Sequence, residues 1–246
     1  MNKSELEQTL VLIKPDALLN SLTGYLLSQL SEFHSGLHFS ATKIVRVSKM
    51  LAEEHYAEHR GKVFYESLLD YITGTLHYPN EPWKRRVVAI AYQGRNAIKK
   101  IRDIAGPTNP HVAREEKPGC IRALGTVVIV KNPEGKEVGE RMDNLIHASA
   151  VPEDAEREIK LWFIPADIPP LMHSYETEMS DAYYCYKNGK LFTSHEPGCI
   201  CLLAPGDIAW KSDIEALRRI SKGEPAAASL NSVAAKYLIN DNRMDS

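Results

Sequence analysis

The sequence lacks the features of a membrane, secreted or disulfide-bonded protein. It has no apolar run long enough to cross a bilayer, and its first residues, Met1 to Glu7, lack the apolar core of a signal peptide. It contains only four cysteines and no C-x-x-C pair. Cys199 and Cys201 alternate as on one face of a strand, a spacing that indicates core packing more often than a metal site. These absences predict a cytoplasmic protein.

The sequence also lacks a strong charge of either sign. Its 30 Lys and Arg residues against 32 Asp and Glu residues give a formal net charge of -2, and no basic block occurs. We therefore expect neither a specific nucleic acid nor an anionic membrane as a partner. The G-x-x-x-x-G-K-[ST] and G-x-G-x-x-G patterns are also missing, so no P-loop or dinucleotide fingerprint predicts a phosphate site.

The sequence contains one weak candidate for a metal site. His55 and His59 have the i, i+4 spacing of helical metal ligands, but no glutamate follows His55 and no third ligand is apparent. We interpret this pair as part of an exposed helix face and expect no direct metal ligand in the chain.

Apolar patterns alternate between strands and helices in the first two-thirds of the chain, which is long enough to bury a real core. The expected segments are, in chain order, the strand Thr9–Ile13, the helix Leu26–Phe33, the strand Leu37–Val47, the strand Val87–Tyr92, the helix Asn96–Ile104 and a strand ending at His147. Two strand–helix–strand halves in this order predict an α+β fold, a ferredoxin-like βαββαβ sandwich with helices on one face of an antiparallel sheet.

Two further regions surround this expected core. A hairpin is expected at about 124–142, and the stretch from Gly106 to Gly119 is expected to be irregular. We take residues 1–165 as one domain and residues 166–246 as a C-terminal extension of hairpin and helices, whose Asn188-Gly189 pair predicts a tight turn. The extension is interpreted as a structural addition packed on the core.

The stretch from Asn144 to Ser149 is the strongest candidate for chemistry. It predicts a short apolar strand ending in His147, followed by a helix from Pro152 to Phe163. Glu158 lies beside the buried face of that helix and could turn back toward the histidine. A carboxylate on one ring nitrogen leaves the other nitrogen free as a nucleophile or base. A core histidine bonded to a backbone carbonyl is the commoner explanation of a lone histidine, so residues elsewhere must decide.

Three cationic residues, far apart in the sequence, could support a functional role for His147. They are Lys14 at a strand end, Arg102 on a helix and Arg122 after a Pro-Gly loop. Each alone would be interpreted as a surface charge. Together with His147 they would form a cationic pocket for a polyphosphate, in which positioning and charge stabilisation catalyse phosphoryl transfer.

Six ordered segments between Gln8 and Phe163 resemble the nucleoside diphosphate kinase family. They are Leu12-Ile13-Lys14-Pro15-Asp16-Ala17, Glu54-His55-Tyr56, Thr108-Asn109-Pro110, Lys117-Pro118-Gly119-Cys120-Ile121-Arg122, Asn144-Leu145-Ile146-His147-Ala148-Ser149 and Glu158-Ile159-Lys160-Leu161-Trp162-Phe163. The resemblance implies that the γ-phosphate of a nucleoside triphosphate passes to a nucleoside diphosphate through a phosphohistidine. It also implies a homo-oligomer.

The resemblance also implies a role for each matching residue. His147 would be the nucleophile, with Glu158 and Ser149 orienting its ring and Tyr56 near the transferring phosphate. Further positions would bind the nucleotide: Lys14 and Asn144 at the sugar hydroxyls, Lys14, Arg102, Thr108 and Arg122 at the phosphates, and Phe64 and Leu68 at the base. Mg²⁺ would bridge the phosphates. Stacking and sugar contacts would ignore the identity of the base.

The chain departs from the family pattern at a few positions. Ala150 follows the serine where the family usually has aspartate, Asp143 precedes Asn144 where arginine is frequent, and Ala17 replaces a glycine. The hairpin and extra residues before Lys117 also differ, which raises a question about the family's oligomer packing. Two other functions remain open: a nucleotide-binding regulatory protein without turnover, and a phosphohistidine enzyme of another class, such as a phosphomutase.

Overall fold

The computed structural model describes residues 6–131 and 134–239. Its main sheet has four strands in the order β2-β3-β1-β6, and every neighbouring pair is antiparallel. These strands are β1 (Glu7–Ile13), β2 (His38–Val45), β3 (Val87–Gly94) and β6 (Ile146–Ala148). The order and the helical connections are those of a ferredoxin-like α+β fold, which confirms the predicted fold class.

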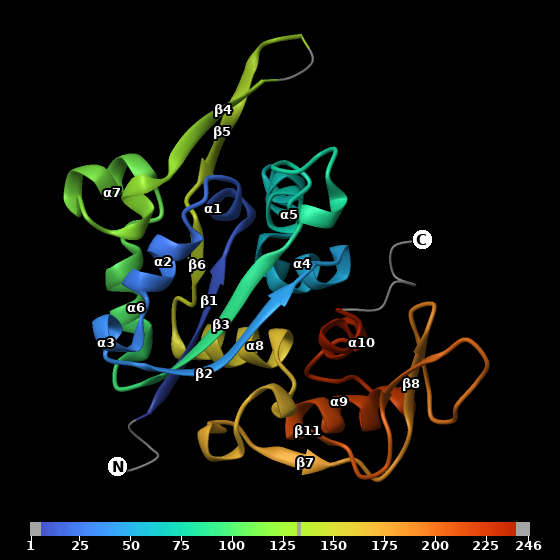
Figure 1. Ribbon diagram of the computed structural model, residues 1–246. Coiled ribbons are helices and arrows are strands. Elements are labelled where there is room, and N and C mark those ends of the chain that lie inside the picture. Colours follow the sequence, from blue (N-terminus) through green and yellow to red (C-terminus); the bar gives the residue numbers. More distant parts are fainter. Residues whose placement is uncertain (1–5, 132–133, 240–246) are drawn as a thin grey trace.

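Helices lie on both faces of this sheet, so the expectation that they cover only one face was wrong (Figure 1). The reason lies in β1, whose apolar residues are consecutive and project to both sides. Leu10 and Leu12 pack in one core cluster, whereas Val11 and Ile13 pack in the other. A strand with two apolar faces needs a cover on each.

Different sets of helices cover the two faces of the sheet. The face of Val11 and Ile13 is covered by α2 (Thr23–Gln29) and α6 (Ala97–Ala105), beside the short helices α1 (Pro15–Leu19) and α3 (Glu32–Ser35). The face of Leu10 and Leu12 is covered by α4 (Lys49–His55), α5 (Tyr65–Thr73) and α8 (Pro152–Trp162). Short 3-10 turns connect these elements: Ala57–His59, Pro82–Lys84 and Ile121–Leu124.

Local signals explain where several helices begin. The hydroxyl of Ser48 accepts a hydrogen bond from the backbone N–H of Leu51 at 3.2 Å and caps α4. The segment expected to be irregular after Gly106 instead contains a helix, α7 (Pro110–Glu116). Asn109 caps α7 and Pro110 occupies its first turn, so the helix has ordinary start signals that the Pro and Gly content of this region conceals.

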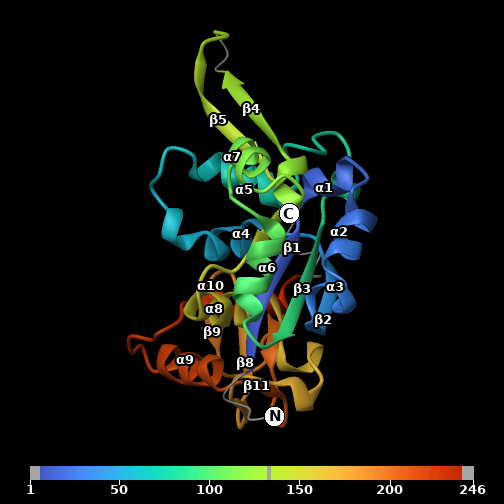
Figure 2. The ribbon, with the colours of Figure 1, turned by 90° about the vertical axis from the view of Figure 1, so that its left-hand side faces the viewer.

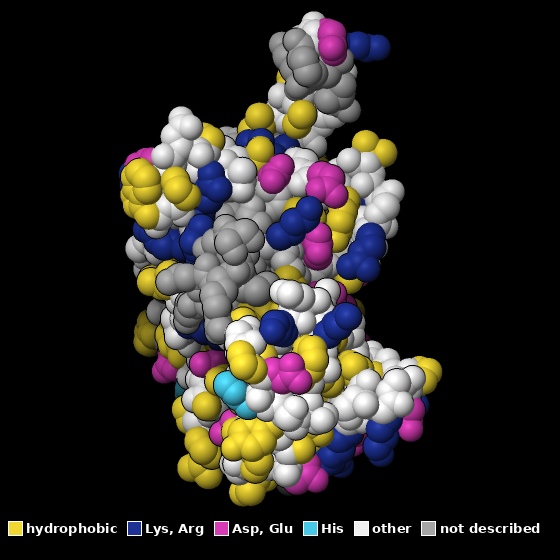
Figure 3. All heavy atoms as spheres, turned by 90° about the vertical axis from the view of Figure 1, so that its right-hand side faces the viewer, with side chains coloured by type: hydrophobic (Ala, Val, Ile, Leu, Met, Phe, Trp, Pro, Cys, Tyr) yellow, Lys and Arg dark blue, Asp and Glu magenta, His cyan; other side chains and the backbone are white. Residues whose placement is uncertain are grey.

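The predicted hairpin is present as β4 (Thr126–Lys131) paired with β5 (Glu137–Asp143). It projects away from the sheet and its helices in both ribbon views (Figure 1, Figure 2). In the space-filling view it also rises above the rest of the molecule (Figure 3). Strand β4 of the hairpin packs against α7, and β5 leads into β6, the strand of the candidate histidine.

The C-terminal region lies at the opposite end of the molecule from the hairpin (Figure 1, Figure 2). Its elements are β7 (Thr177–Met179), β8 (Tyr184–Lys187), β9 (Lys190–Phe192), β10 (Ile200–Leu203), β11 (Ile208–Trp210), α9 (Lys211–Ser221), α10 (Leu230–Ala234) and the 3-10 turns Pro165–Asp167, Pro170–Met172 and Ala235–Tyr237. Asn188 and Gly189 have positive φ angles in the turn between β8 and β9, which confirms the predicted hairpin.

This region shares its core with the main sheet. Trp210 is fully buried among residues of α4 and α8, and its indole Nε1 donates a hydrogen bond to the carbonyl of Phe163 at 2.7 Å. The expected packing of Cys199 and Cys201 on one face was only half right, because Cys199 is buried whereas Cys201 is exposed next to a bulge in β10. In the described part of the chain, no helix has the length and apolar character to span a bilayer.

Candidate active site

A cavity of about 510 Å³ opens between α5, the inner end of β5 and the strand of His147. It brings together nine of the residues proposed from the sequence: Lys14, Tyr56, Phe64, Leu68, Arg102, Thr108, Arg122, Asn144 and His147. Other residues of its wall were not anticipated: His59, Ser67, Tyr71, Glu140, Arg141, Met142, Ile146, Ala148 and Ala150. The hairpin residues among these could not be predicted from the sequence, because they reach the cavity only through the path that the backbone takes from β5 to β6.

His147 lies at the wall of this cavity with a carboxylate behind it. Its Nε2 is 2.9 Å from Oε1 of Glu158, and Oε2 of Glu158 accepts a hydrogen bond from the Ser149 hydroxyl at 2.6 Å. Burial alone would raise the pKa of Glu158, but the interactions with His147, His55 and Ser149 outweigh burial and lower it to about 2. Glu158 is therefore ionised and holds Nε2, so the nitrogen of His147 available to the cavity is Nδ1.

His55 is the residue for which the sequence interpretation was wrong. It is buried, not part of an exposed face, and its ring lies across that of His147 with centroids 4.6 Å apart. Nδ1 of His55 accepts a hydrogen bond from the Trp162 indole at 3.2 Å. Burial, then the nearby His147, lowers the pKa of His55 to about 3, so the ring is neutral. The sequence did offer one signal, because His55 is part of Glu54-His55-Tyr56, a segment that resembles the family.

The same hydrogen bond decides the metal question at this cluster. One nitrogen each of His55 and His147 and an oxygen of Glu158 lie within 4.8 Å of one another, as in a zinc site. However, a neutral His55 that accepts from Trp162 at Nδ1 carries its proton on Nε2, which is then no ligand. A metal would have to displace that hydrogen bond, so the cluster fits a histidine held in place better than a metal centre.

Lys14 is a buried cation at the start of α1. Its Nζ donates to the side-chain oxygen of Asn144, whose amide in turn donates to the carbonyl of Thr108 at 2.8 Å. Burial lowers the pKa of Lys14 to about 8, with Arg122 adding a smaller repulsion and Asp16 opposing the shift. Within the described residues, no carboxylate forms an ion pair with Lys14.

Asp16 does not pair with Lys14 but accepts a hydrogen bond from the backbone. Its Oδ2 accepts a hydrogen bond from the N–H of Leu145 at 2.9 Å. Leu145 has a φ of +70°, a left-handed conformation that costs a non-glycine residue energy unless neighbours hold it. The backbone N–H of Lys14 also donates to the Leu145 carbonyl at 2.9 Å. The Lys-Pro-Asp segment therefore fixes the backbone that leads to His147.

Arg122 is a second buried cation without a carboxylate among the described residues. Its guanidinium donates to the carbonyls of Gly106 at 3.0 Å and Ile146 at 3.3 Å, while its Nε has no partner in the described structure. Burial and, secondly, the charge of Arg102 lower its pKa to about 10. A buried guanidinium that is left unneutralised is costly, and it predicts an anionic ligand.

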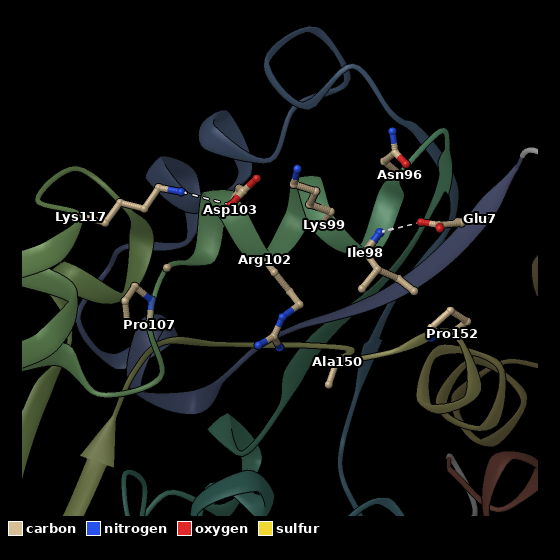
Figure 4. A pocket seen from close by; sticks show the side chains of 11 residues that line it. Glu7, Asn96, Ile98, Lys99, Arg102, Asp103, Pro107, Lys117, Ala150 and Pro152 are labelled. Atoms are coloured by element: carbon tan, nitrogen blue, oxygen red, sulfur yellow. Dashed lines mark hydrogen bonds and ion pairs between the residues drawn. The ribbon is translucent and has the colours of Figure 1, made fainter.

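Arg102 lies between this cavity and a second one. Figure 4 shows its side chain leaving α6 and pointing away from Lys99 and Asp103, toward the segment of Ala150. Arg102 and Ala150 line both the cavity of His147 and a neighbouring groove of about 590 Å³. At the other end of the His147 cavity, Phe64 is half-exposed and Leu68 follows it on α5, which leaves a flat apolar wall for a planar group.

Among the described residues lining the His147 cavity, the only carboxylate is that of Glu140. The cavity therefore offers cations and amides but no cage of oxygen ligands for a hard metal ion. A metal ion at this cavity would therefore need oxygen ligands from a bound molecule.

Comparisons with known proteins agree with this geometry. Residues 7–168 match the protein-family model described as nucleoside diphosphate kinase. The chain is 38% identical over 168 residues to the nucleoside diphosphate kinase of Thermococcus kodakarensis, covering 68% of this chain and 83% of that protein. It is 39% identical over 165 residues to that of Pyrococcus furiosus, covering 67% and 88%.

Solved structures give the same result. The Aquifex aeolicus nucleoside diphosphate kinase is 31% identical with a TM-score of 0.53, covering 67% of this chain and 99% of that one. A transition state mimic of the Borrelia burgdorferi enzyme with bound vanadate and ADP is 27% identical with a TM-score of 0.52, covering 68% and 92%. The protein therefore belongs to the nucleoside diphosphate kinase family.

Proposed function

We propose that His147 carries a phosphoryl group from a nucleoside triphosphate to a nucleoside diphosphate, in the reaction of this phosphotransferase family. One observation supports the assignment most strongly. His147, whose Nε2 lies 2.9 Å from Glu158, lines a cavity that also contains Lys14 and Arg122, two buried cations without an ion-pair partner in the described structure. A polyphosphate would neutralise both cations and place a phosphorus atom before the histidine.

The chemistry follows from the orientation of the ring. The lone pair of Nδ1 attacks the γ-phosphorus, a P–N bond forms, and the bond to the β-phosphate oxygen breaks to release a nucleoside diphosphate. The positive charge that develops on the imidazole is stabilised by the ionised Glu158, which Ser149 holds in place. A second nucleoside diphosphate then attacks the phosphohistidine, and the same steps run in reverse.

The other proposed roles follow the polarity of the cavity. Arg102, Thr108 and Arg122 bind the phosphates, and Tyr56 lies near the transferred group. Lys14 and Asn144 are already hydrogen-bonded to each other and meet the sugar hydroxyls, while Lys14 also reaches phosphate. Phe64 and Leu68 support the base. Mg²⁺ enters with the nucleotide and neutralises phosphate charge.

The test is the substitution His147→Ala. Incubation with ATP labelled at the γ-phosphate should give the unmodified chain an acid-labile, alkali-stable phosphate, and transfer to GDP should follow. His147→Ala should lose both the label and the transfer. His38→Ala, at an exposed histidine on β2, is the matched control and should retain both. Near-normal transfer by His147→Ala, or nucleotide binding without transfer by the unmodified chain, would contradict the proposal.

We further propose that residues 1–165 contain the catalytic machinery, that residues 166–246 brace it, and that the protein assembles as a homo-oligomer. Sedimentation equilibrium of the full chain tests the oligomer. A cytoplasmic location is also proposed, because all four cysteines are unpaired and a reducing compartment would keep them so.

A further inference from the structure

Three of the four cysteines come together at the small sheet β10-β8-β9 of the C-terminal region. Cys185 belongs to β8, and Cys201 of β10 lies directly opposite it in the antiparallel ladder. Cys199 comes two residues before Cys201. Figure 1 shows β8 at the end of the molecule away from the β4–β5 hairpin, and none of the three cysteines lines the His147 cavity.

These cysteines lie on the face of the small sheet opposite to the apolar core of the C-terminal region, which includes Leu202, Leu217 and Val233. Both tyrosines that flank Cys185 pack in that core, and Ile200, which lies between the other two cysteines, packs against it. Because side chains alternate along a strand, the three thiols project to the other face. Filling this apolar core therefore does not account for them.

The three thiols differ in exposure, and Cys185 contacts the other two. Cys185 and Cys199 are buried, whereas Cys201 is exposed. Burial, then a hydrogen bond with the Cys199 thiol and the proximity of Cys201, raise the pKa of Cys185 to about 12. Cys185 therefore remains a protonated thiol that does not react with an oxidant on its own. The sulfur that an oxidant in solution can reach is that of Cys201.

The positions of Cys185 and Cys201 suit a disulfide bond. Residues directly opposite in antiparallel strands have Cα atoms about 4.5–5.5 Å apart, which lies within the range of about 4.4–6.8 Å that disulfides span. A metal centre of three thiolates does not fit. Among the described residues, the group of three ligand atoms that lie within 4.8 Å of one another is the cluster around His147, and it contains no cysteine.

We propose that Cys201 and Cys185 form a peroxide-reactive site that closes into a reversible disulfide between β10 and β8. The sulfur of Cys201 attacks a peroxide oxygen, the O–O bond breaks, and a sulfenic acid forms on Cys201 with release of water or an alcohol. The sulfur of Cys185 then attacks that of Cys201. The S–S bond forms, the S–O bond breaks, and the hydroxide leaves as water with the proton of Cys185. Two thiols lose two electrons, which reduce the peroxide.

Cys199 gives this disulfide a second position. Its thiol contacts Cys185, so its sulfur can attack that of Cys185 and release Cys201 as a thiol. This exchange moves the bond to the buried pair without further oxidation. The inference goes beyond the proposed phosphotransfer and does not depend on it, because no step involves His147 or a nucleotide.

Limited oxidation of the full chain with hydrogen peroxide tests the proposal. Remaining thiols are alkylated, and peptide mass mapping locates the disulfide. The unmodified chain should form a disulfide within one chain that includes Cys185, and Cys120, which is buried elsewhere, should stay alkylated. A thiol reductant should restore every thiol.

Three variants assign the steps. Cys201→Ser should form the disulfide about tenfold more slowly or not at all, because the buried thiols are shielded from the peroxide. Cys185→Ser should stop at a sulfenic acid on Cys201, which dimedone traps. Cys199→Ser is the matched control, since it removes a buried thiol of the same cluster, and its disulfide should join Cys185 and Cys201.

Each of three results would overturn the inference: a disulfide that forms at the normal rate in Cys201→Ser, oxidation of Cys120 as fast as that of Cys201, or disulfides that form only between chains on a non-reducing gel. Circular dichroism of each variant before oxidation establishes that a changed rate does not come from unfolding.

Discussion

Lys14 and Arg122 are kept charged in an environment that disfavours charge. Burial lowers the pKa of each, and the two cations repel each other. Neither is neutralised by an ion pair among the described residues, so their electrostatic energy improves when an anion enters the cavity. We therefore expect these two cations to lower the stability of the free protein and ligand binding to offset that loss.

The pKa of about 8 for Lys14 predicts a pH dependence of binding. The protonated lysine binds phosphate, and the free protein loses this proton as the pH rises through about 8, so affinity for ADP should fall above that pH. For folding the sign is opposite: the unfolded lysine keeps its proton up to about 10.5, so stability rises between pH 8 and 10.5. Titrations of ADP at several pH values measure the affinity.

Lys14→Met supplies the control for that profile. It should bind ADP about tenfold more weakly at pH 7, the scale of one charged contact, and should show a flatter dependence above pH 8. An unmodified chain whose ADP affinity stays constant from pH 7 to pH 10 would show that Lys14 does not contribute its charge to the ligand.

At the same scale, the pairing of His147 with Glu158 was predicted from the pattern of a strand followed by a helix, whereas the role of Ser149 came from the family resemblance. His55 was not understood. Its i, i+4 partner His59 suggested an exposed face, whereas Trp162, more than a hundred positions later, receives His55 into the core. Burial created by distant residues cannot be derived from a local pattern.

At the scale of elements, the connection from α6 to α7 depends on one glycine. Gly106 has φ +82° and ψ -177°, a conformation that is essentially restricted to glycine. A Cβ placed there would lie 2.1 Å from Sγ of Cys120. The Gly106 carbonyl accepts a hydrogen bond from Arg122, so a shift of this turn would also displace a cation of the active site.

Gly106→Ala should therefore destabilise the protein by about 3 kcal/mol, from backbone strain and overpacking together. It should also weaken nucleotide binding through Arg122. Urea unfolding followed by circular dichroism gives the free energy of unfolding. Gly24→Ala, where nothing lies within 4 Å of the added Cβ, should change that free energy by less than about 1 kcal/mol. Equal stability of the two variants would contradict the steric argument.

The sequence predicted the positions of the strands better than it predicted the helices that pack against them. Periodicity located the four sheet strands and both hairpins, because alternation and an Asn-Gly turn are local properties. The helix Pro110–Glu116 was missed, since its cap and proline also suit a loop. The second helical layer was missed because a continuous apolar run such as Leu10–Ile13 does not say what covers each side.

At the scale of the whole molecule, the C-terminal region completes the core of the main sheet. Trp210 lies among residues of α4 and α8, and α8 carries Glu158. Trp210→Ala should destabilise the full chain by about 3–5 kcal/mol, the cost of removing a fully buried indole. Thermal or urea unfolding measures this loss. Trp83→Ala, at a side chain that is 73% exposed, should stay within about 0.5 kcal/mol of the parent.

The position of Trp210 also has a consequence for synthesis on the ribosome. Residues 14–158, which include the proposed nucleotide site, emerge from the ribosome first. Trp210 and Ala235, which pack against α4 and α8, leave the exit tunnel only later. Until then the nascent chain presents an open apolar surface, which is a target for chaperones. Phosphotransfer should therefore begin late in translation, and chains that stop early should be degraded before they can act.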